Sequence, residues 1–214
     1  MPSDIRKNVF TLDEMSGMKV VYITDVEGNL DYFEHLVSTS KGLYRDNNRL
    51  LQLKENFHFV YGGDVCDRGK GDIRIATDLV SLAKRYPNNV HLILGNRDVN
   101  KMRLCREFES EQLLRKPSVY WVNDDDINEP QRDSTMLPCG RADRLHTILE
   151  CTMGAPEAFE NRIQELSEIG QISDGMTSAE KDEIVVKSYL ESVQPGGCMS
   201  EYLRLGTLAV LLGT

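Results

Sequence analysis

Short apolar stretches alternate with helical patterns over the first half of the chain, and this alternation constrains the fold more than any other feature. Four stretches are short and rich in apolar and β-branched residues, as buried strands are. They span residues 18–25, 49–53, 57–61 and 90–94. Apolar residues recur at helical spacing within residues 30–37 and 72–85, and 99–114 is a further helix candidate. This order predicts an α/β fold with a parallel sheet and right-handed crossovers.

Three of the expected strands end in glycine-containing corners that are crowded with polar residues. The corners read DVEGN at 25–29, GGDVCDRG at 62–69 and GNRD at 95–98. Glycine lets the backbone turn sharply and approach closely. In parallel α/β sheets the ligand binds beyond the carboxyl ends of the strands. The three corners are therefore expected to converge on one site.

The oxygen-bearing side chains of these corners indicate a site for divalent metal ions. Asp25 and Glu27 alternate along the chain that leaves a strand, so both carboxylates can reach one cation. Asp64 at the tip of its strand can bridge two ions, and the amide oxygen of Asn96 is a neutral hard ligand. Without metal, the three carboxylates would repel one another. With two divalent ions they would accept a phosphate and acidify a bound water molecule.

The second corner also offers a group that can bind phosphate. Asp67 can orient Arg68 through a bidentate pair, and Arg68 would then present its planar fork to a phosphate. The basic residues that follow the third corner are interpreted as a solvated helix face. They are Lys101, Arg103 and Arg106.

The motifs D-x-E-G, G-D-x-x-D-R-G and G-N-R-D, in this order at strand ends, resemble the first three motifs of the calcineurin-like metallophosphoesterase superfamily. That superfamily includes the Ser/Thr protein phosphatases and the diadenosine tetraphosphatases, and the resemblance covers roughly residues 18–105. It implies hydrolysis of a phosphate ester or phosphoanhydride by metal-activated water. It also implies that Asp25 binds the first ion, Asp64 bridges, Asn96 binds the second ion and Arg68 contacts the phosphate.

Two positions depart from the usual pattern of this family. Glu27 stands where histidine is usual, which shifts the preference toward Mn²⁺ or Mg²⁺, with iron and zinc as alternatives. Arg97 stands where a histidine usually acts as the general acid, and arginine cannot donate a proton usefully. We therefore expect Arg97 to stabilise charge on the phosphoryl group or leaving oxygen, which favours aryl phosphates and phosphoanhydrides over alkyl phosphates. The candidate catalytic residues are Arg68, Arg97, Asp67 and Asp98.

The second half of the chain has a different character. Helical patterns recur there, around residues 141–151, 156–169 and 178–193. We predict an N-terminal extension, an N-terminal phosphoesterase half, a mainly helical insertion or cap, and the start of a C-terminal half. These parts span residues 1–17, 18–122, 123–198 and 199–214.

The family completes its site with histidines on a second sheet, within a four-layer αββα sandwich. Beyond Asp98 the one histidine is His146, which lies in a helical pattern and is interpreted as a helix-face residue. We therefore expect the first sheet to be present, the second to be largely missing, and the chain to be a fragment. Cys66 is interpreted as a small packing residue, because a metal mechanism needs no thiol.

Composition excludes some classes of function. A net charge of −9 argues against a nucleic-acid partner or an anionic membrane surface. Five scattered cysteines without a C-x-x-C pair are typical of reduced thiols in the cytoplasm. No signal peptide and no membrane span are expected. A phosphorylated protein, nucleotide or small molecule is the expected substrate. The alternative is a non-catalytic protein with a binding or regulatory role, which the substitutions at Glu27 and Arg97 favour.

Overall fold

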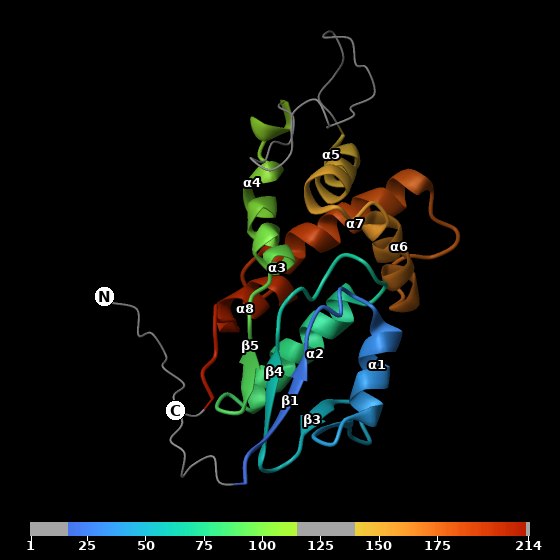
Figure 1. Cartoon of the computed structure of the whole chain (residues 1–214). Helices are drawn as coiled ribbons and strands as arrows, with labels where there is room; N and C mark the ends of the chain where they lie inside the picture. The colour runs from blue at the N-terminus through green and yellow to red at the C-terminus, as the bar shows by residue number, and fades with distance from the viewer. Residues whose placement is uncertain (1–16, 115–139, 213–214) are drawn as a thin grey trace.

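The structure of the protein, a computed structural model, describes residues 17–114 and 140–212 (Figure 1). Its sheet consists of three parallel strands in the order β1–β4–β5. These are β1 (Lys19–Ile23), β4 (Phe57–Tyr61) and β5 (Val90–Leu92). In the register, Val21 lies opposite Phe59, and Phe59 lies opposite Val90. The parallel sheet confirms the α/β class that the alternation of strands and helices predicted.

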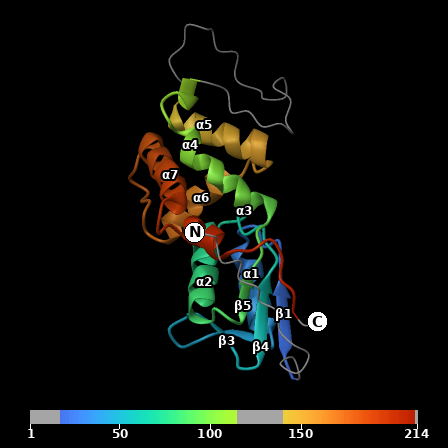
Figure 2. The ribbon, with the colours of Figure 1, turned by 90° about the vertical axis from the view of Figure 1, so that its left-hand side faces the viewer.

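Helices α1 (Leu30–Thr39) and α2 (Asp72–Arg85) provide the crossovers between the strands. Figure 2 shows α2 along one face of the sheet. Phe33 and Val37 of α1 and Ile75 and Leu79 of α2 are buried in one core with Phe59 of β4. Helical spacing had predicted both helices. A short antiparallel pair, β2 (Leu43–Arg45) and β3 (Leu51–Leu53), lies beside them. The β2 strand was not predicted, because only one of its three residues, Leu43, is apolar and buried.

A layer of helices lies beyond the carboxyl ends of the strands (Figures 1 and 2). It contains α5 (Arg141–Thr147), the π-helical turn Ile148–Thr152, α6 (Ala158–Glu168) and α7 (Ser178–Val193). The helical patterns of the sequence predicted these segments. Buried apolar residues of the sheet and of this layer form one continuous core.

The segment after β5 differs from the single helix expected over 99–114. It is divided into α3 (Asn96–Asn100), the 3₁₀ turn Lys101–Arg103, α4 (Leu104–Glu107) and the 3₁₀ turn Gln112–Leu114. The helix starts earlier than expected because the Asp98 carboxylate accepts a hydrogen bond from the N–H of Gly95, 2.8 Å away. The interpretation of Lys101 as solvated was wrong, since its side chain is fully buried, whereas Arg106 is exposed.

After α7 the chain forms α8 (Cys198–Leu205), a helix that was not predicted. Thr207 then forms a parallel bridge to Ile93 just past β5. The four-layer sandwich and the part boundaries at 17, 122 and 198 stay predictions, and the boundary at 122 lies outside the described residues. Within the described residues, none of the helices is both long and apolar enough to span a bilayer.

Candidate active site

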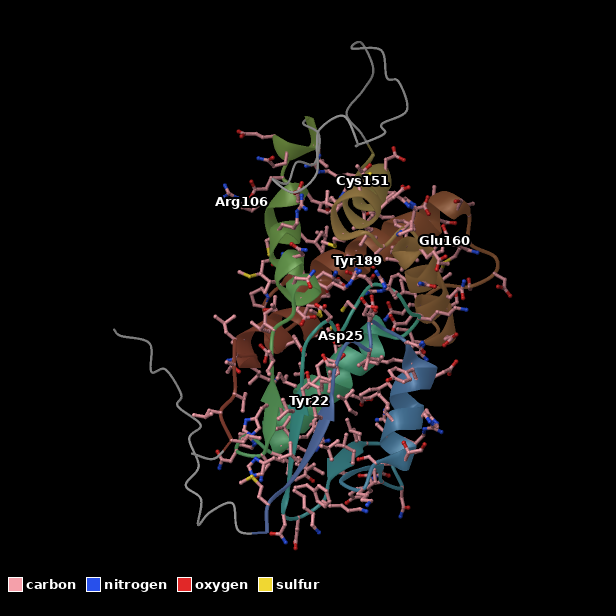
Figure 3. The ribbon with its side chains drawn as sticks, in the orientation of Figure 1. Tyr22, Asp25, Arg106, Cys151, Glu160 and Tyr189 are labelled. Atoms are coloured by element: carbon pink, nitrogen blue, oxygen red, sulfur yellow. The ribbon has the colours of Figure 1, made fainter. Side chains whose placement is uncertain are left out.

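Hydrogen bonds donated by backbone N–H groups hold the three polar corners together at the carboxyl ends of the strands. The N–H of Asp25 donates to the carbonyl of Gly63 at 3.1 Å, and the N–H of Glu27 donates to the carbonyl of Asp64 at 3.0 Å. The N–H of Arg97 donates to Oδ1 of Asp64 at 2.9 Å, which joins the third corner to the second. Figure 3 shows Asp25 at the end of β1 that faces the helical layer. The corners therefore meet, as the sheet topology predicted.

Asp98 joins the second and third corners from within. Its buried carboxylate accepts hydrogen bonds from the N–H groups of Asp64 at 3.0 Å, Val65 at 2.9 Å and Gly95 at 2.8 Å. Burial raises the pKa of Asp98 to about 6, against the effect of the three N–H donors. This geometry gives Asp98 a role in holding the loops, while its predicted catalytic role stays a prediction.

Two motif glycines pack against each other, which explains why the motifs need them. A Cβ on Gly69 would lie 2.2 Å from the carbonyl carbon of Gly28. Gly28 itself has a φ of +80°, and a Cβ there would lie 2.1 Å from Oδ1 of Asp72. The first and second corners are thus in backbone contact, and a larger residue would separate them.

The backbone of both corners is strained at its acidic residues. Asp25, Glu27, Asp64 and Asp67 have φ values of 51°, 50°, 55° and 98°. Non-glycine residues in this region cost about 1–3 kcal/mol each and concentrate at functional sites. The cross-corner hydrogen bonds hold this conformation.

Glu27 lies between two arginines. Its Oε1 is 2.8 Å from Nε of Arg97, and its Oε2 is 3.4 Å from Nη1 of Arg68. The Arg97 side chain is only 10% exposed, and its Nη1 donates to the carbonyl of Met153 at 3.0 Å. The Arg68 side chain is 59% exposed. Arg97 is therefore fixed, and Arg68 can turn toward a ligand.

Asp67 has a different partner from the one expected. It forms a wholly buried ion pair with Nζ of Lys101, and Nη1 of Arg97 lies 4.0 Å from its Oδ2. The expected pair between Asp67 and Arg68 is not formed within the described structure, where Arg68 faces Glu27. The sequence held a signal for Lys101: it lies four residues after Arg97, which puts both cations on one side of a helix.

The donor atoms of three corner residues fit a hard divalent cation. Asp25 and Asn96 are exposed, Asp64 is half-buried, and all three offer oxygen ligands of the kind that Mn²⁺ and Mg²⁺ prefer. Glu27 does not fit in the same way, because both of its oxygens face arginines. Over residues 17–114 and 140–212, no three His, Cys, Asp or Glu side chains are grouped so that they could hold a metal ion. The assignment of metal ligands thus stays a prediction.

The helical layer contacts the second corner through buried charges. Nη2 of Arg162 lies 3.1 Å from Oδ2 of Asp72, whose Oδ1 accepts a hydrogen bond from the N–H of Asp67 at 3.1 Å. Glu165 accepts hydrogen bonds from the N–H groups of Ile73 at 3.2 Å and Arg74 at 3.1 Å, in the first turn of α2. The layer therefore positions the helix that follows the corner.

These positioning residues were missed from the sequence, although a signal existed. Arg162 lies on the same helical face as Phe159 and Leu166, and all three are buried. A charged residue on an apolar helix face implies a buried partner. Burial raises the pKa of Asp72 to about 7, and Arg162 opposes this shift.

Two residues have the structural roles that the sequence predicted. Cys66 is buried with its Sγ 3.5 Å from Sδ of Met199, and burial raises the pKa of its thiol. His146 lies on α5 and stacks on the ring of Phe159 at 3.8 Å between centroids. The packing interpretation of Cys66 and the helix-face interpretation of His146 are thereby confirmed.

A polar cleft of about 350 Å³ opens beside Arg68, between the second corner and α6. Basic and amide side chains line it together with acidic ones. They include Asn29, Arg68, Lys70, Arg74, Asn161 and Glu168.

The family model of the calcineurin-like phosphoesterases matches residues 18–196. The chain therefore belongs to this family, as the three motifs predicted. A Caenorhabditis elegans protein provisionally named a serine/threonine-protein phosphatase is 25% identical over 72 residues, which are 34% of this chain and 16% of that protein. The chain thus matches only a small part of the length of this curated relative.

One solved structure is that of a protein serine/threonine phosphatase from Saccharomyces cerevisiae with similarity to human phosphatase PP5. It matches with 22% identity and a TM-score of 0.32, over 41% of this chain and 24% of the yeast chain. A TM-score this low does not show a shared whole fold, so the family model carries the assignment.

Proposed function

We propose that the protein hydrolyses a phosphate ester or phosphoanhydride with the help of divalent metal ions. The observation that carries this proposal is the direct hydrogen bonding of the three motif corners to one another. In the proposal, Asp25, Asp64 and Asn96 bind the metal, with Mn²⁺ or Mg²⁺ favoured by their oxygen donors. The bound metal would supply an acidified water molecule as the nucleophile.

Arg68 is the proposed phosphate contact. Its guanidinium is exposed, lies 3.4 Å from Glu27, and lines the polar cleft. A planar guanidinium suits two phosphoryl oxygens at once. Arg97, which is held by Glu27 and by the carbonyl of Met153, would stabilise negative charge on the phosphoryl group without transferring a proton. The substrate can be a phosphorylated protein, a nucleotide or a small molecule, and a cytoplasmic location is part of the same proposal.

Hydrolysis of an aryl phosphate by the purified chain tests this proposal. We expect turnover that requires Mn²⁺ or Mg²⁺ and is abolished by a chelator. Asp64→Asn should reduce turnover by about a hundredfold or more, and Arg68→Ala should raise KM. Arg106→Ala, at an exposed position on α4, is the control variant. Equal rates for wild type and Asp64→Asn would refute a metal-dependent reaction at this corner.

A non-catalytic phosphate-binding role is the second candidate. The observation that favours it is the neutralisation of Glu27 by two arginines, which removes one carboxylate from the cluster. Phosphate binding measured by calorimetry separates the two functions. Binding that is lost in Arg68→Ala, together with no turnover under any metal condition, would support the non-catalytic role.

A further inference from the structure

The two residues that depart from the family pattern contact each other. Nε of Arg97 and Oε1 of Glu27 are 2.8 Å apart, and the two side chains are only 10% and 21% exposed. The opposite side of the guanidinium is held as well, since Nη1 donates to the carbonyl of Met153 at 3.0 Å. Arg97 is thus clamped between the first corner and the helical layer.

This pair leaves Glu27 poorly placed to bind a metal ion. A divalent cation must lie about 2.0–2.6 Å from a carboxylate oxygen. Oε1 already accepts the Arg97 hydrogen bond, and the Arg68 guanidinium faces Oε2 at 3.4 Å. A metal ion at either oxygen would have a guanidinium as its nearest neighbour, and cations repel strongly in a partly buried site.

Within residues 17–114 and 140–212, three other oxygen donors of the corners, Asp25, Asp64 and Asn96, have no cationic side-chain partner, whereas Asp67 is taken up by Lys101. Asp64 uses Oδ1 to accept the backbone N–H of Arg97 at 2.9 Å. Asp25 is exposed and uses Oδ2 to accept the hydroxyl of Thr24 at 2.5 Å. Asn96 is exposed at the start of α3. These residues keep oxygen donors for one cation.

We infer that Glu27 is a positioning residue that holds the Arg97 guanidinium, and that the corners bind one divalent ion instead of two. In this inference the fixed positive charge of Arg97 would supply part of the charge that a second ion would bring. The departures at Glu27 and Arg97 therefore form one coupled change. An ion pair between these two residues stands where the family usually has a metal ligand and a general acid. The single-ion part of this inference rests on the proposed function, whereas the pairing does not.

Manganese binding to the full chain tests the first part, measured by calorimetry and by the electron paramagnetic resonance signal of free Mn²⁺. We expect one ion per chain, with an affinity that Glu27→Gln changes by less than about threefold. Asp64→Asn should weaken binding by about tenfold or more, as loss of a ligand does. Two ions per chain, no bound ion, or equal losses in Glu27→Gln and Asp64→Asn would each overturn the single-ion inference.

A double-mutant cycle on the metal-free chain tests the pairing, so its result does not depend on the proposed function. We expect Glu27→Gln and Arg97→Gln to be coupled by about tenfold in the urea unfolding equilibrium constant. The same cycle on the exposed pair of Arg141 and Glu183, 2.8 Å apart, should show about twofold coupling or less. Additive effects of the Glu27 and Arg97 substitutions would overturn the positioning role.

Discussion

Nζ of Lys101 and Oδ2 of Asp67 form an ion pair in which neither side chain is exposed to solvent. Each charge has left water, and Oδ1 of Asp67 has no hydrogen-bond partner among the described atoms. Replacing one partner of such a pair lowers the stability of the fold strongly, because the charge of the other partner stays buried without compensation.

Lys101→Met should therefore lower the free energy of unfolding by about 3–5 kcal/mol, measured by urea denaturation. Adding Asp67→Asn to this variant removes the uncompensated charge, so the double variant should be more stable than Lys101→Met alone. Arg106→Ala, at an exposed position nearby, should change stability by no more than about 0.5 kcal/mol. An unchanged free energy of unfolding in Lys101→Met would contradict the presence of the buried ion pair.

Gly69→Ala should disturb the contact between the first two corners. The new Cβ would lie 2.2 Å from backbone atoms of Gly28, so one loop must move, at a cost of about 1–3 kcal/mol. Gly175→Ala is the matched control, because no atom lies within 4 Å of a Cβ at that position. Thermal unfolding of both variants measures the difference, and similar Tm values would argue against the close approach.

Glu165→Ala should destabilise the start of α2. The buried Glu165 carboxylate accepts from two N–H groups of that helix, at 3.2 and 3.1 Å, and lies near Arg162. Loss of these acceptors should cost about 2–3 kcal/mol in urea denaturation. Glu160→Ala removes an exposed carboxylate from α6, the helix that carries Glu165 (Figure 3), and should change stability by about 0.5 kcal/mol or less. Equal effects of the two substitutions would refute the capping role.

His91 should make stability depend on pH. It is buried beside His58, with ring nitrogens 3.1 Å apart, and burial lowers the pKa of His91 from 6.5 to about 4. The unfolded chain binds this proton first, so the contribution of His91 is complete above pH 6.5 and is lost as pH falls toward 4.

A comparison of wild type with His91→Leu isolates this contribution. The stability of wild type relative to the variant should fall as pH is lowered from 6.5 to about 4. His35→Gln, at an exposed position on α1, should follow wild type over the same range. A constant difference between wild type and His91→Leu would show that His91 has no lowered pKa.

The rate of hydrolysis should depend strongly on the leaving group, because Arg97 cannot protonate it. We expect kcat/KM for an aryl phosphate to exceed that for an alkyl phosphate by about a hundredfold or more, the usual contribution of a general acid. Both activities should be lost in Asp64→Asn, which excludes a contaminating phosphatase. Comparable rates for the two substrates would show that another residue donates the proton.

The sequence by itself determined the longer helices, the strands of the parallel sheet and the family. Helices over 72–85 and 178–193 and the strand over 57–61 are present as the spacing of apolar residues predicted, because their periods come from burial of one face. The three glycine corners meet, as the sequence predicted, since parallel strands end at the same edge of a sheet.

Tertiary structure alone decided the partners of the charged residues. Asp67 pairs with Lys101 instead of Arg68, and Glu27 with Arg97, across gaps of 34 and 70 positions in the chain. Arg162 and Glu165 contact α2 from a distant helix in the same way. Ion pairing depends on which side chains are brought together away from water, and residue spacing carries no information about contacts between separate elements.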